Sequence, residues 1–529
     1  MNDNAGSCQI VNCASFKFTN KRSLSMCSNL LLSKPYFMIY CFIVLPTQSH
    51  MMEKHPKSLR IFFATEMWER YGFYVVQSLL ALYLALHFHW PDKQVYVLVG
   101  TFTGLTYLSP LLGGWIADQL IGQKRAIITG AVILFISYCL LSLINTNLAL
   151  TSALAGIAVG TGLLKPNISS LLGNEYPTGS VRRENGFTIF YMGITTGIVL
   201  GTVLPSHLSH QFGWSATYFS AAIGMIIALM VFVFGIIQYK IEDYNPFTFQ
   251  PQNIFLAFIL LLILWSVLFY ILNSPQLANA LFGMVVLLAA CYILYSVNRE
   301  SPAQARQTLV IGLLCIISVV FWAFYFQMFT SLTLFISRVV QPTLLGVKFP
   351  PPYYVTIQSI GMLIIGYFLA RKHHQYTLSE RGLSTGKKFL LAMLLMTIAF
   401  AIIVLVCTFL EKSALLSPLL IIPAYLMFSL AELLLSPVGL SAITVLADQN
   451  KVSTMIGIFF VSLGIGAFLS GKLASLTAIP EGETNIVVLK QLYATAFTQQ
   501  LGILFIATLG CLVIYAVIKF LLTNVQIIE

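Results

Sequence analysis

The sequence predicts an all-α polytopic membrane protein. Hydrophobic residues make up 58% of its 529 residues and charged residues only 9%, whereas charged residues make up about 25% of a soluble domain. Apolar stretches of about 20 residues, the length of a helix that crosses ~30 Å of hydrocarbon, recur along most of the chain. A membrane barrel would instead show alternating strands of about ten residues, so the spans are expected to be helices.

The apolar spans number fourteen and fall into groups of six, two and six. The first six cover residues 59–88, 94–116, 125–146, 149–173, 186–207 and 214–238, and the last six cover 307–336, 352–370, 387–410, 415–446, 453–478 and 498–522. The middle pair, 253–272 and 277–297, contains no charged residue and is expected to be an inserted hairpin that links two halves. Two six-helix bundles plus two linker helices resemble the major facilitator fold, in which substrate binds near the middle of the bilayer between the halves.

The same pattern predicts four segments. Residues 1–51 differ in texture from the rest and are expected to be a leader of uncertain structure, either disordered or preceding a true start at Met51 or Met52. The other segments are an N-terminal bundle over 52–240, a linker with its hairpin over 241–305 and a C-terminal bundle over 306–529.

Basic residues gather in alternate loops. The richer loops hold Lys124, Arg125, Arg182, Arg183, Lys240, Arg299, Arg306, Arg371, Lys372, Arg381, Lys387 and Lys388, and the loops between them hold Lys93, Arg338, Lys348, Lys412 and Lys490. The positive-inside rule therefore predicts a multi-pass plasma-membrane protein, expected in a bacterial inner membrane, with the richer loops and both termini in the cytoplasm. Because membrane orientation explains the net charge of +11, no nucleic acid partner is expected.

Three charges interrupt the first span, in the stretch "TEMWERYGFY". Each of Glu66, Glu69 and Arg70 would cost ~2.5–3.5 kcal/mol if it were unpaired at the centre of a membrane helix. Glu66 and Arg70 stand at i and i+4 in the favourable order, and Tyr74 continues the same stripe. We expect these side chains to face an internal, hydrated cavity; the alternative is a local salt bridge that only fixes helix packing.

The loop after the second span, "GGWIADQLIGQKR", has the spacing of the major facilitator cytoplasmic signature. Its conformational residues would be Asp118, Gly122 and Arg125. Glycine permits a tight turn, and Asp118 is expected to pair with a basic residue or cap a neighbouring helix end. A generic glycine-rich basic turn is the alternative.

Further polar side chains occur at membrane depth in other spans. They are Lys165, Gln327, Gln358 and Glu432, and acids and bases spread over four helices indicate a polar path. Lys165 and Glu432 each precede a proline, and a proline removes one backbone hydrogen bond from its helix.

Four motifs resemble those of the proton-dependent oligopeptide transporter family of major facilitators. "EMWERYGFY" resembles its first-helix motif, "GTGLLKPNISSLLGNEY" its fourth-helix motif, "FTIFYMGITTG" its fifth-helix motif and "AELLLSPVGLS" its tenth-helix motif. "YFQMFTSLTLF" and the two extra helices are most similar to the bacterial di- and tripeptide permease branch. The resemblance covers residues 52 to about 519 and implies a proton-coupled importer of di- and tripeptides.

The resemblance also implies roles for individual residues. Proton coupling would involve Glu66, Glu69 and Glu432. Arg70 and Lys165 would hold the carboxylate of a zwitterionic peptide while Glu432 receives its amino terminus. The full set of implied substrate-binding residues is Arg70, Tyr74, Tyr107, Lys165, Trp322, Gln327, Glu432 and Ser436, and core packing remains the alternative for each aromatic side chain.

The chain departs from the family pattern at four positions. Thr195 stands where the family usually has Asn, Phe73 where it has Tyr, Phe326 where it often has Glu, and Gly361 where an Asn-Pro pair would begin. Several neutral contacts to substrate would thus be lost. Without an acid at Phe326, Lys165 is expected to turn to Glu69 or to a substrate carboxylate.

Two other functions stay open: a transporter of another small zwitterion or amino acid derivative, favoured by Thr195 and Gly361, and a transport-inactive sensor or scaffold. An enzyme is not expected, because no nucleophile and base stand at convincing intervals and the histidines lack metal-ligand spacing. The expected partners are small peptides and the lipid bilayer. We expect a monomer with no metal and no cofactor other than the coupling proton.

Overall fold

The computed structural model describes residues 55–143, 146–177, 181–243, 250–370, 378–409 and 414–523. The chain divides into Met1–His55 and Pro56–Glu529, and the described helices and strands lie in the second unit. The predicted leader, both chain termini, Arg371, Lys372 and Lys412 lie outside the described residues, so nothing tests the expectations placed on them.

Helices α3 to α7 correspond to the first six predicted spans. Their bounds are α3 Leu59–Leu86, α4 Asp92–Ile116, the π-helical turn η2 Ala117–Ile121, α5 Gln123–Leu143, α6 Asn147–Asn174 and α7 Val181–Tyr239. The long α7 contains two of the predicted spans, which meet at Gly213 with a non-helical φ of 80°. A lipid-embedded chain must pair its backbone groups internally, which is why these apolar segments are helical.

The linker and the C-terminal half follow the predicted order. The linker hairpin consists of α8 Pro251–Asn273 and α9 Pro275–Arg299. The remaining elements are α10 Pro302–Tyr325, η3 Phe326–Phe329, α11 Ser331–Val339, β1 Thr343–Leu344, β2 Val347–Lys348, α12 Pro352–Ala370, α13 Leu378–Phe409, η4 Pro418–Leu420, α14 Ile422–Leu446, α15 Val452–Ala474, η5 Ser475–Thr477 and α16 Ile486–Thr523. The antiparallel pair β1–β2 forms a small turn outside the helices.

The predicted fold class is confirmed. Within the described ranges, eleven helices are long and apolar enough to cross a membrane. One of these, Asn185–Tyr239, contains both helices of α7, and α3 and α12 occupy the two other predicted spans. Some predicted boundaries were wrong: α16 begins at Ile486 and α13 at Leu378, earlier than the apolar runs at 498 and 387. These helices continue through polar turns, which hydropathy alone does not recognise as helical.

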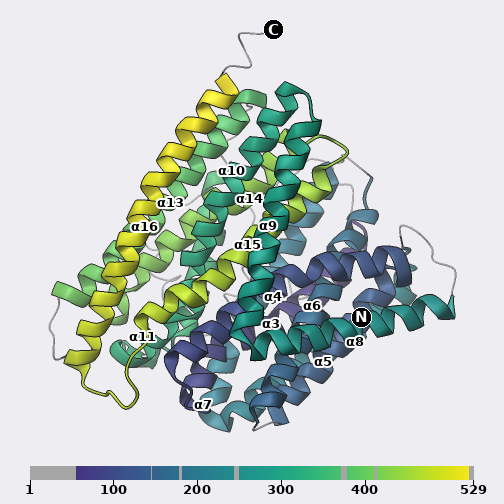
Figure 1. Cartoon of the computed structure of the whole chain (residues 1–529). Coiled ribbons are helices and arrows are strands. Elements are labelled where there is room, and N and C mark those ends of the chain that lie inside the picture. Colours follow the sequence, from purple (N-terminus) through teal and green to yellow (C-terminus); the bar gives the residue numbers. More distant parts are fainter. Residues whose placement is uncertain are drawn as a thin grey trace, which may run out of the picture. The chain divides into compact units, whose positions relative to one another are not determined.

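Each half has its own buried core. One hydrophobic cluster draws chiefly on α3 to α9 and the other chiefly on α10 to α16. Figure 1 shows the N-terminal helices, purple to blue, and the C-terminal helices, green to yellow, as two groups. Inside the N-terminal half α3 packs on α7 and α5 on α6, and inside the other half α13 packs on α14 and α16. The predicted residue limits of these domains remain a prediction.

The halves meet where α4 packs on α15 and where α7 packs on α12. Glycines allow the α4–α15 approach: a Cβ on Gly100 would lie 2.7 Å from the Gly471 Cα, and one on Gly104 would lie 2.8 Å from the Gly464 carbonyl. Small residues of this kind let membrane helices pack closely. The crossing is therefore a tight backbone contact between the two halves.

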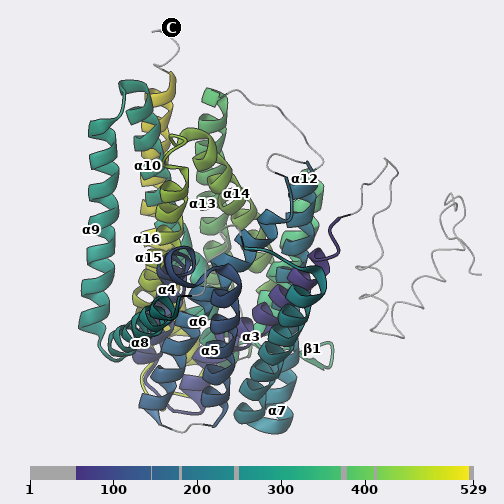
Figure 2. The same cartoon turned by 90° about the vertical axis from the view of Figure 1, so that its right-hand side faces the viewer.

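The linker hairpin touches both halves, as the sequence suggested. On α8, the Trp265 indole donates to the Ser152 carbonyl of α6 at 3.2 Å. On α9, Phe282 stacks on Phe468 of α15 with ring centres 4.1 Å apart, and Glu300 after its end accepts a 2.7 Å bond from Lys451. Figure 2 shows α9 standing at the edge of the helices. The hairpin thus contacts the N-terminal half through α8 and the C-terminal half through α9.

Candidate functional site

The three charges of α3 form one buried cluster. Glu66, Glu69 and Arg70 are 2%, 0% and 4% exposed. The Arg70 guanidinium donates from two nitrogens to both carboxylate oxygens of Glu69, and the Nη2 bond measures 2.7 Å. The predicted i, i+4 partner is more distant, with Arg70 Nε 3.4 Å from Glu66 Oε1. Arg70 therefore pairs chiefly with its sequence neighbour, because the fork of a guanidinium matches the two oxygens of one carboxylate.

Glu66 keeps one carboxylate oxygen free of donors. Its Oε2 is buried and has no hydrogen-bond partner among the residues that the structure describes. Buried polar atoms are almost always hydrogen bonded, so such an atom calls for an explanation. A proton on Oε2 would make Glu66 neutral and weaken its ion pair with Arg70, which contacts the other oxygen.

Lys165 of α6 is the second base of the site. It is half-buried, and its Nζ lies 4.9 Å from the centre of the Tyr107 ring, a cation–π geometry. The charges of Glu66, Glu69 and Arg70 all act on it, but within the described ranges it forms no ion pair with a carboxylate. Lys165 is thus within electrostatic reach of Glu69, as expected, but does not contact it directly.

Glu432 is the acid of the opposite half. It lies on α14, and its Oε2 accepts hydrogen bonds from the Tyr325 hydroxyl at 2.8 Å and from the Gln358 amide at 2.7 Å. These donors come from α10 and α12, so three helices meet at this carboxylate. Ser436 follows one turn later on α14 and is half-buried, which places it on the same face as Glu432.

Two tyrosines lie between the charged groups of the halves. Tyr74 of α3 and Tyr107 of α4 are each within electrostatic reach of both Arg70 and Glu432. Their rings also contact the opposite half, Tyr74 at 6.3 Å from Phe329 and Tyr107 at 5.6 Å from Phe326. The structure thus brings the acids and bases of both halves around one centre.

Tyr191 of α7 lies near the same centre. It is 58% exposed, and both Glu66 and Glu432 are within electrostatic reach of its hydroxyl. Charged side chains at membrane depth face hydrated interiors, which is the setting expected for these two acids.

Trp322 and Gln327, two further predicted site residues, differ in whether their polar groups are already hydrogen bonded. Trp322 packs on Tyr325 and Phe326, and its buried indole N–H has no partner in the described part of the chain. Gln327, in contrast, is fully engaged: its amide nitrogen donates to Ala323 and Ser470 carbonyls at 3.0 Å, and its oxygen accepts from Ser331 at 2.6 Å. In this conformation Gln327 holds α15 against η3 and offers no group to a ligand.

The signature loop takes the expected shape with a different acid at the helix start. Gly122 has a φ of 80° and donates to the Ala117 carbonyl at 2.8 Å, so only glycine fits without strain. Asp118 is exposed, and within the described ranges it caps no helix. Instead Asp243, after α7, accepts from the Lys124 backbone N–H at 2.9 Å at the start of α5. Arg125, the residue after Lys124, is half-buried.

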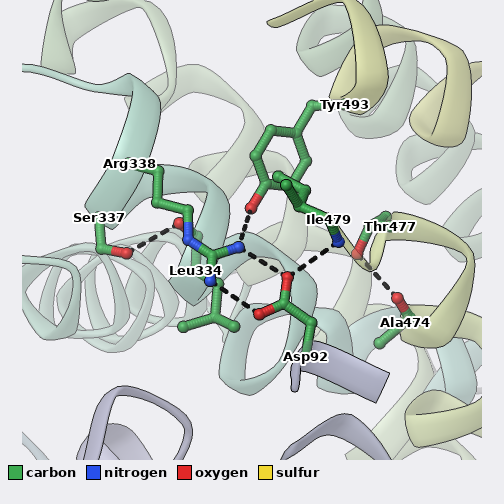
Figure 3. A network of polar contacts seen from close by, with 8 residues as sticks. All are labelled: Asp92, Leu334, Ser337, Arg338, Ala474, Thr477, Ile479 and Tyr493. Atoms are coloured by element: carbon green, nitrogen blue, oxygen red, sulfur yellow. Dashed lines mark hydrogen bonds and ion pairs between the residues drawn. The ribbon is translucent and has the colours of Figure 1, made fainter. Parts of the chain in front are cut away.

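A polar network fastens the halves together at the side opposite the basic loops (Figure 3). Arg338 of α11 donates two bonds to the carboxylate of Asp92, at 2.6 and 2.7 Å, and a third to the Tyr493 hydroxyl at 3.2 Å. The Ile479 backbone N–H also donates to Asp92, at 3.1 Å. On the same side the hydroxyls of Thr202 and Thr356 lie 2.7 Å apart. Asp92 of one half is thus bound by two segments of the other.

Sequence reasoning missed some of these residues for identifiable reasons. Tyr325 and Tyr191 resemble ordinary aromatic residues of apolar spans, and no spacing distinguished them. Arg338 was assigned only to a loop with few basic residues, and Asp92 was not singled out. Nothing in the sequence pairs positions that lie 246 residues apart, although a lone acid beside an apolar span is a signal that could have been followed.

Comparisons with known proteins point in one direction. A model of the POT family matches residues 124–488. The dipeptide and tripeptide permease A of Enterobacter sp. (strain 638) is 32% identical over 450 residues, which cover 84% of this chain and 89% of that protein. The dipeptide and tripeptide permease B of Yersinia enterocolitica is 30% identical over 453 residues and covers 84% of this chain and 91% of its own.

Solved structures agree on the fold. A solved structure from work on substrate recognition in proton dependent oligopeptide transporters superposes with a TM-score of 0.75 at 24% identity. The superposition covers 88% of this chain and 99% of that chain. A tetrameric PepTSo2 structure gives a TM-score of 0.77 at 24% identity with the same coverage. At this level of identity the likeness concerns the arrangement of helices.

Proposed function

The chain belongs to the POT family, and from that premise we propose that it is a proton-coupled symporter that imports di- and tripeptides by alternating access. The observation that carries the proposal is the placement of opposite charges in the two halves. Arg70 and Lys165 lie in the N-terminal half, Glu432 lies in the C-terminal half, and Tyr74 and Tyr107 lie within reach of both sides.

The charges fit the ends of a peptide. A dipeptide is a zwitterion at neutral pH, because its carboxyl titrates near about 3.5 and its amine near about 8. Its carboxylate can meet Arg70 and Lys165 while its ammonium meets Glu432. Tyr74, Tyr107, Trp322 and Ser436 would line the peptide between these ends. A ligand held at both ends favours the conformation in which the halves are closest, as any ligand-driven shift requires.

The proton sites follow from the same geometry. In the part of the chain that the structure describes, one oxygen of Glu66 has no donor and Glu432 has no basic ion-pair partner. Glu69 shares Arg70 with Glu66. Protonation of Glu66 or Glu69 releases Arg70 from a competing carboxylate, so proton uptake and binding of the peptide carboxylate support each other. The proton is the only cofactor that this mechanism needs.

The second candidate is a transporter of another small zwitterion. Gly361 offers no side chain to a ligand, and a Cβ at that position would lie 2.8 Å from the Ser429 hydroxyl, so α12 packs on α14 where the family pattern has a polar side chain. Thr195 is also engaged, donating to the Tyr191 carbonyl at 3.2 Å. A shorter zwitterion would need fewer of these neutral contacts.

Uptake into proteoliposomes separates the two candidates. We expect labelled dialanine to accumulate when an inward proton gradient is imposed and to equilibrate without concentration when it is absent. Glu432→Gln should lose accumulation, while Glu481→Gln, the same change in an exposed loop acid, should keep it. Absence of dialanine uptake by the unaltered protein, together with binding of a free amino acid derivative, would favour the second candidate.

The chain is a multi-pass membrane protein. For its setting we propose the inner membrane of a bacterium with both termini in the cytoplasm, because the basic residues gather in alternate loops. We also propose the monomer as the transporting unit, since every group of the site comes from one chain.

A further inference from the structure

Both hydrogen-bond donors to Glu432 reach the same oxygen. Tyr325 and Gln358 each bond Oε2, at 2.8 and 2.7 Å. Within the described part of the chain, Oε1 of Glu432 has no protein partner. The carboxylate is therefore held on one side and left free on the other.

The orientation of Gln358 is fixed by its surroundings. Its amide oxygen accepts from the Ser359 hydroxyl at 3.3 Å, and its backbone carbonyl accepts from the Ser429 hydroxyl of α14 at 2.7 Å. An amide nitrogen only donates, so the NH2 group must face the carboxylate and the carbonyl must face away. Gln358 is 3% exposed and therefore has no solvent to turn to.

A proton on Oε2 would face two donors. It would cost two hydrogen bonds to an ionised acceptor, which are roughly twice as strong as neutral ones. Oε1 has no such obstacle, and it is also the oxygen that a ligand's ammonium can approach.

We propose that Tyr325 and Gln358 are positioning residues that reserve Oε1 of Glu432 for one occupant at a time, either the substrate's ammonium or the coupling proton. This inference rests on the proposed function and deepens it. The amine and the proton then compete for one atom, and the site selects ligands with a free amino terminus through these two donors.

The other titratable groups near Glu432 supply no positive charge that could take the place of the ligand's ammonium. Tyr325 faces it from α10, and Tyr74, Tyr107 and Tyr191 interact with it from α3, α4 and α7. None of these phenols carries charge at neutral pH, since tyrosine titrates near about 10. Within the described residues Glu432 forms no ion pair with a basic side chain, so its amine partner must come from the ligand.

The test compares two ligands that differ in one group. Equilibrium binding of dialanine and of N-propionyl-alanine, the same molecule without its amino group, is measured on the purified full chain in nanodiscs by calorimetry. The unaltered protein should prefer dialanine. Tyr325→Phe and Gln358→Leu should each reduce that preference about tenfold, the effect of losing one hydrogen bond to a charged group, and should leave the affinity for N-propionyl-alanine unchanged.

A pH series distinguishes positioning from simple structural support. Between about pH 5 and about pH 7 neither end of dialanine titrates. Because the two donors stabilise ionised Glu432, the variants should lose more of their preference at the acid end and regain part of it at the neutral end. A general packing defect would not recover in this way.

Gln77→Leu is the matched control. Gln77 is also a buried membrane glutamine, 2% exposed, but its amide bonds the neutral Thr103 at 3.1 Å. An equal loss of preference in Gln77→Leu would overturn the inference, as would an unchanged preference in Tyr325→Phe, which removes one hydroxyl and keeps the ring. If the unaltered protein bound neither ligand, the proposed function would fail before the variants were compared.

Discussion

The ion pair between Asp92 and Arg338 should control whether the halves separate at the side opposite the basic loops. Asp92→Asn removes the charge that Arg338 contacts through two bonds of 2.6 and 2.7 Å and keeps the size of the side chain. Asp92 is buried, with its side chain 4% exposed, whereas the Arg338 side chain is 27% exposed. The change therefore leaves a partly hydrated guanidinium without its carboxylate.

The size of the effect follows from that burial. Truncating one partner of a buried, hydrogen-bonded charge pair costs roughly 2–5 kcal/mol, and because water reaches Arg338 the lower end, about 2 kcal/mol, applies. Since 1.4 kcal/mol is tenfold in an equilibrium constant, the equilibrium between closed and open halves at this side should shift about 30-fold towards the open state.

Amide hydrogen exchange followed by mass spectrometry measures this opening equilibrium without a chemical probe on the protein. The amide of Ile479 donates to Asp92. Its protection, and that of the start of α4 and the end of α11, should therefore fall about 30-fold in Asp92→Asn. The charge swap Asp92→Arg with Arg338→Asp should restore part of it. Glu481→Gln, an exposed acid two positions from Ile479, should change nothing. Unchanged protection at these helix ends, or an equal loss along all helices, would refute the reasoning.

The remaining predictions concern the site and the crossing of the halves. Glu432→Gln should abolish concentrative uptake of dialanine in proteoliposomes, and accumulation at the unaltered level would remove the role given to this acid. Arg70→Lys should weaken dialanine binding about tenfold, because an ammonium cannot form the two-pronged contact of a guanidinium; calorimetry measures it. Gly471→Ala places a Cβ 2.4 Å from the Tyr96 carbonyl and should cost about 1–3 kcal/mol of stability, seen as a lower melting temperature. Gly502→Ala, with nothing within 4 Å of its Cβ, is its control.

The fold could be predicted because the bilayer imposes a simple rule on the sequence. Every apolar run of the right length had to be a helix, so the order of α3 to α16 follows from hydropathy. The helix ends did not follow, since the first turns of α16 mix apolar residues with polar ones such as Lys490 and Gln491. Nor did the break between α10 and α11, where the short helix η3 carries Gln327.

The candidate site could be predicted only as a set of residues. The high cost of charge in hydrocarbon was enough to indicate that Glu66, Arg70, Lys165 and Glu432 gather in one interior. Pairing within the set depends on side-chain geometry that spacing does not contain. Arg70 thus favours Glu69 over the i+4 partner.

The charges of the site explain why one proton and one peptide can travel together. With Glu66, Glu69 and Glu432 ionised against Arg70 and Lys165, three negative charges face two positive ones, and a zwitterionic peptide adds none. Closing the halves removes water and strengthens every uncompensated interaction, so a site that remains negative closes at a higher cost. One proton makes the loaded site neutral. Glu432→Gln removes the odd negative charge permanently, so the site can close without a proton, which is why uptake in that variant should no longer follow the gradient.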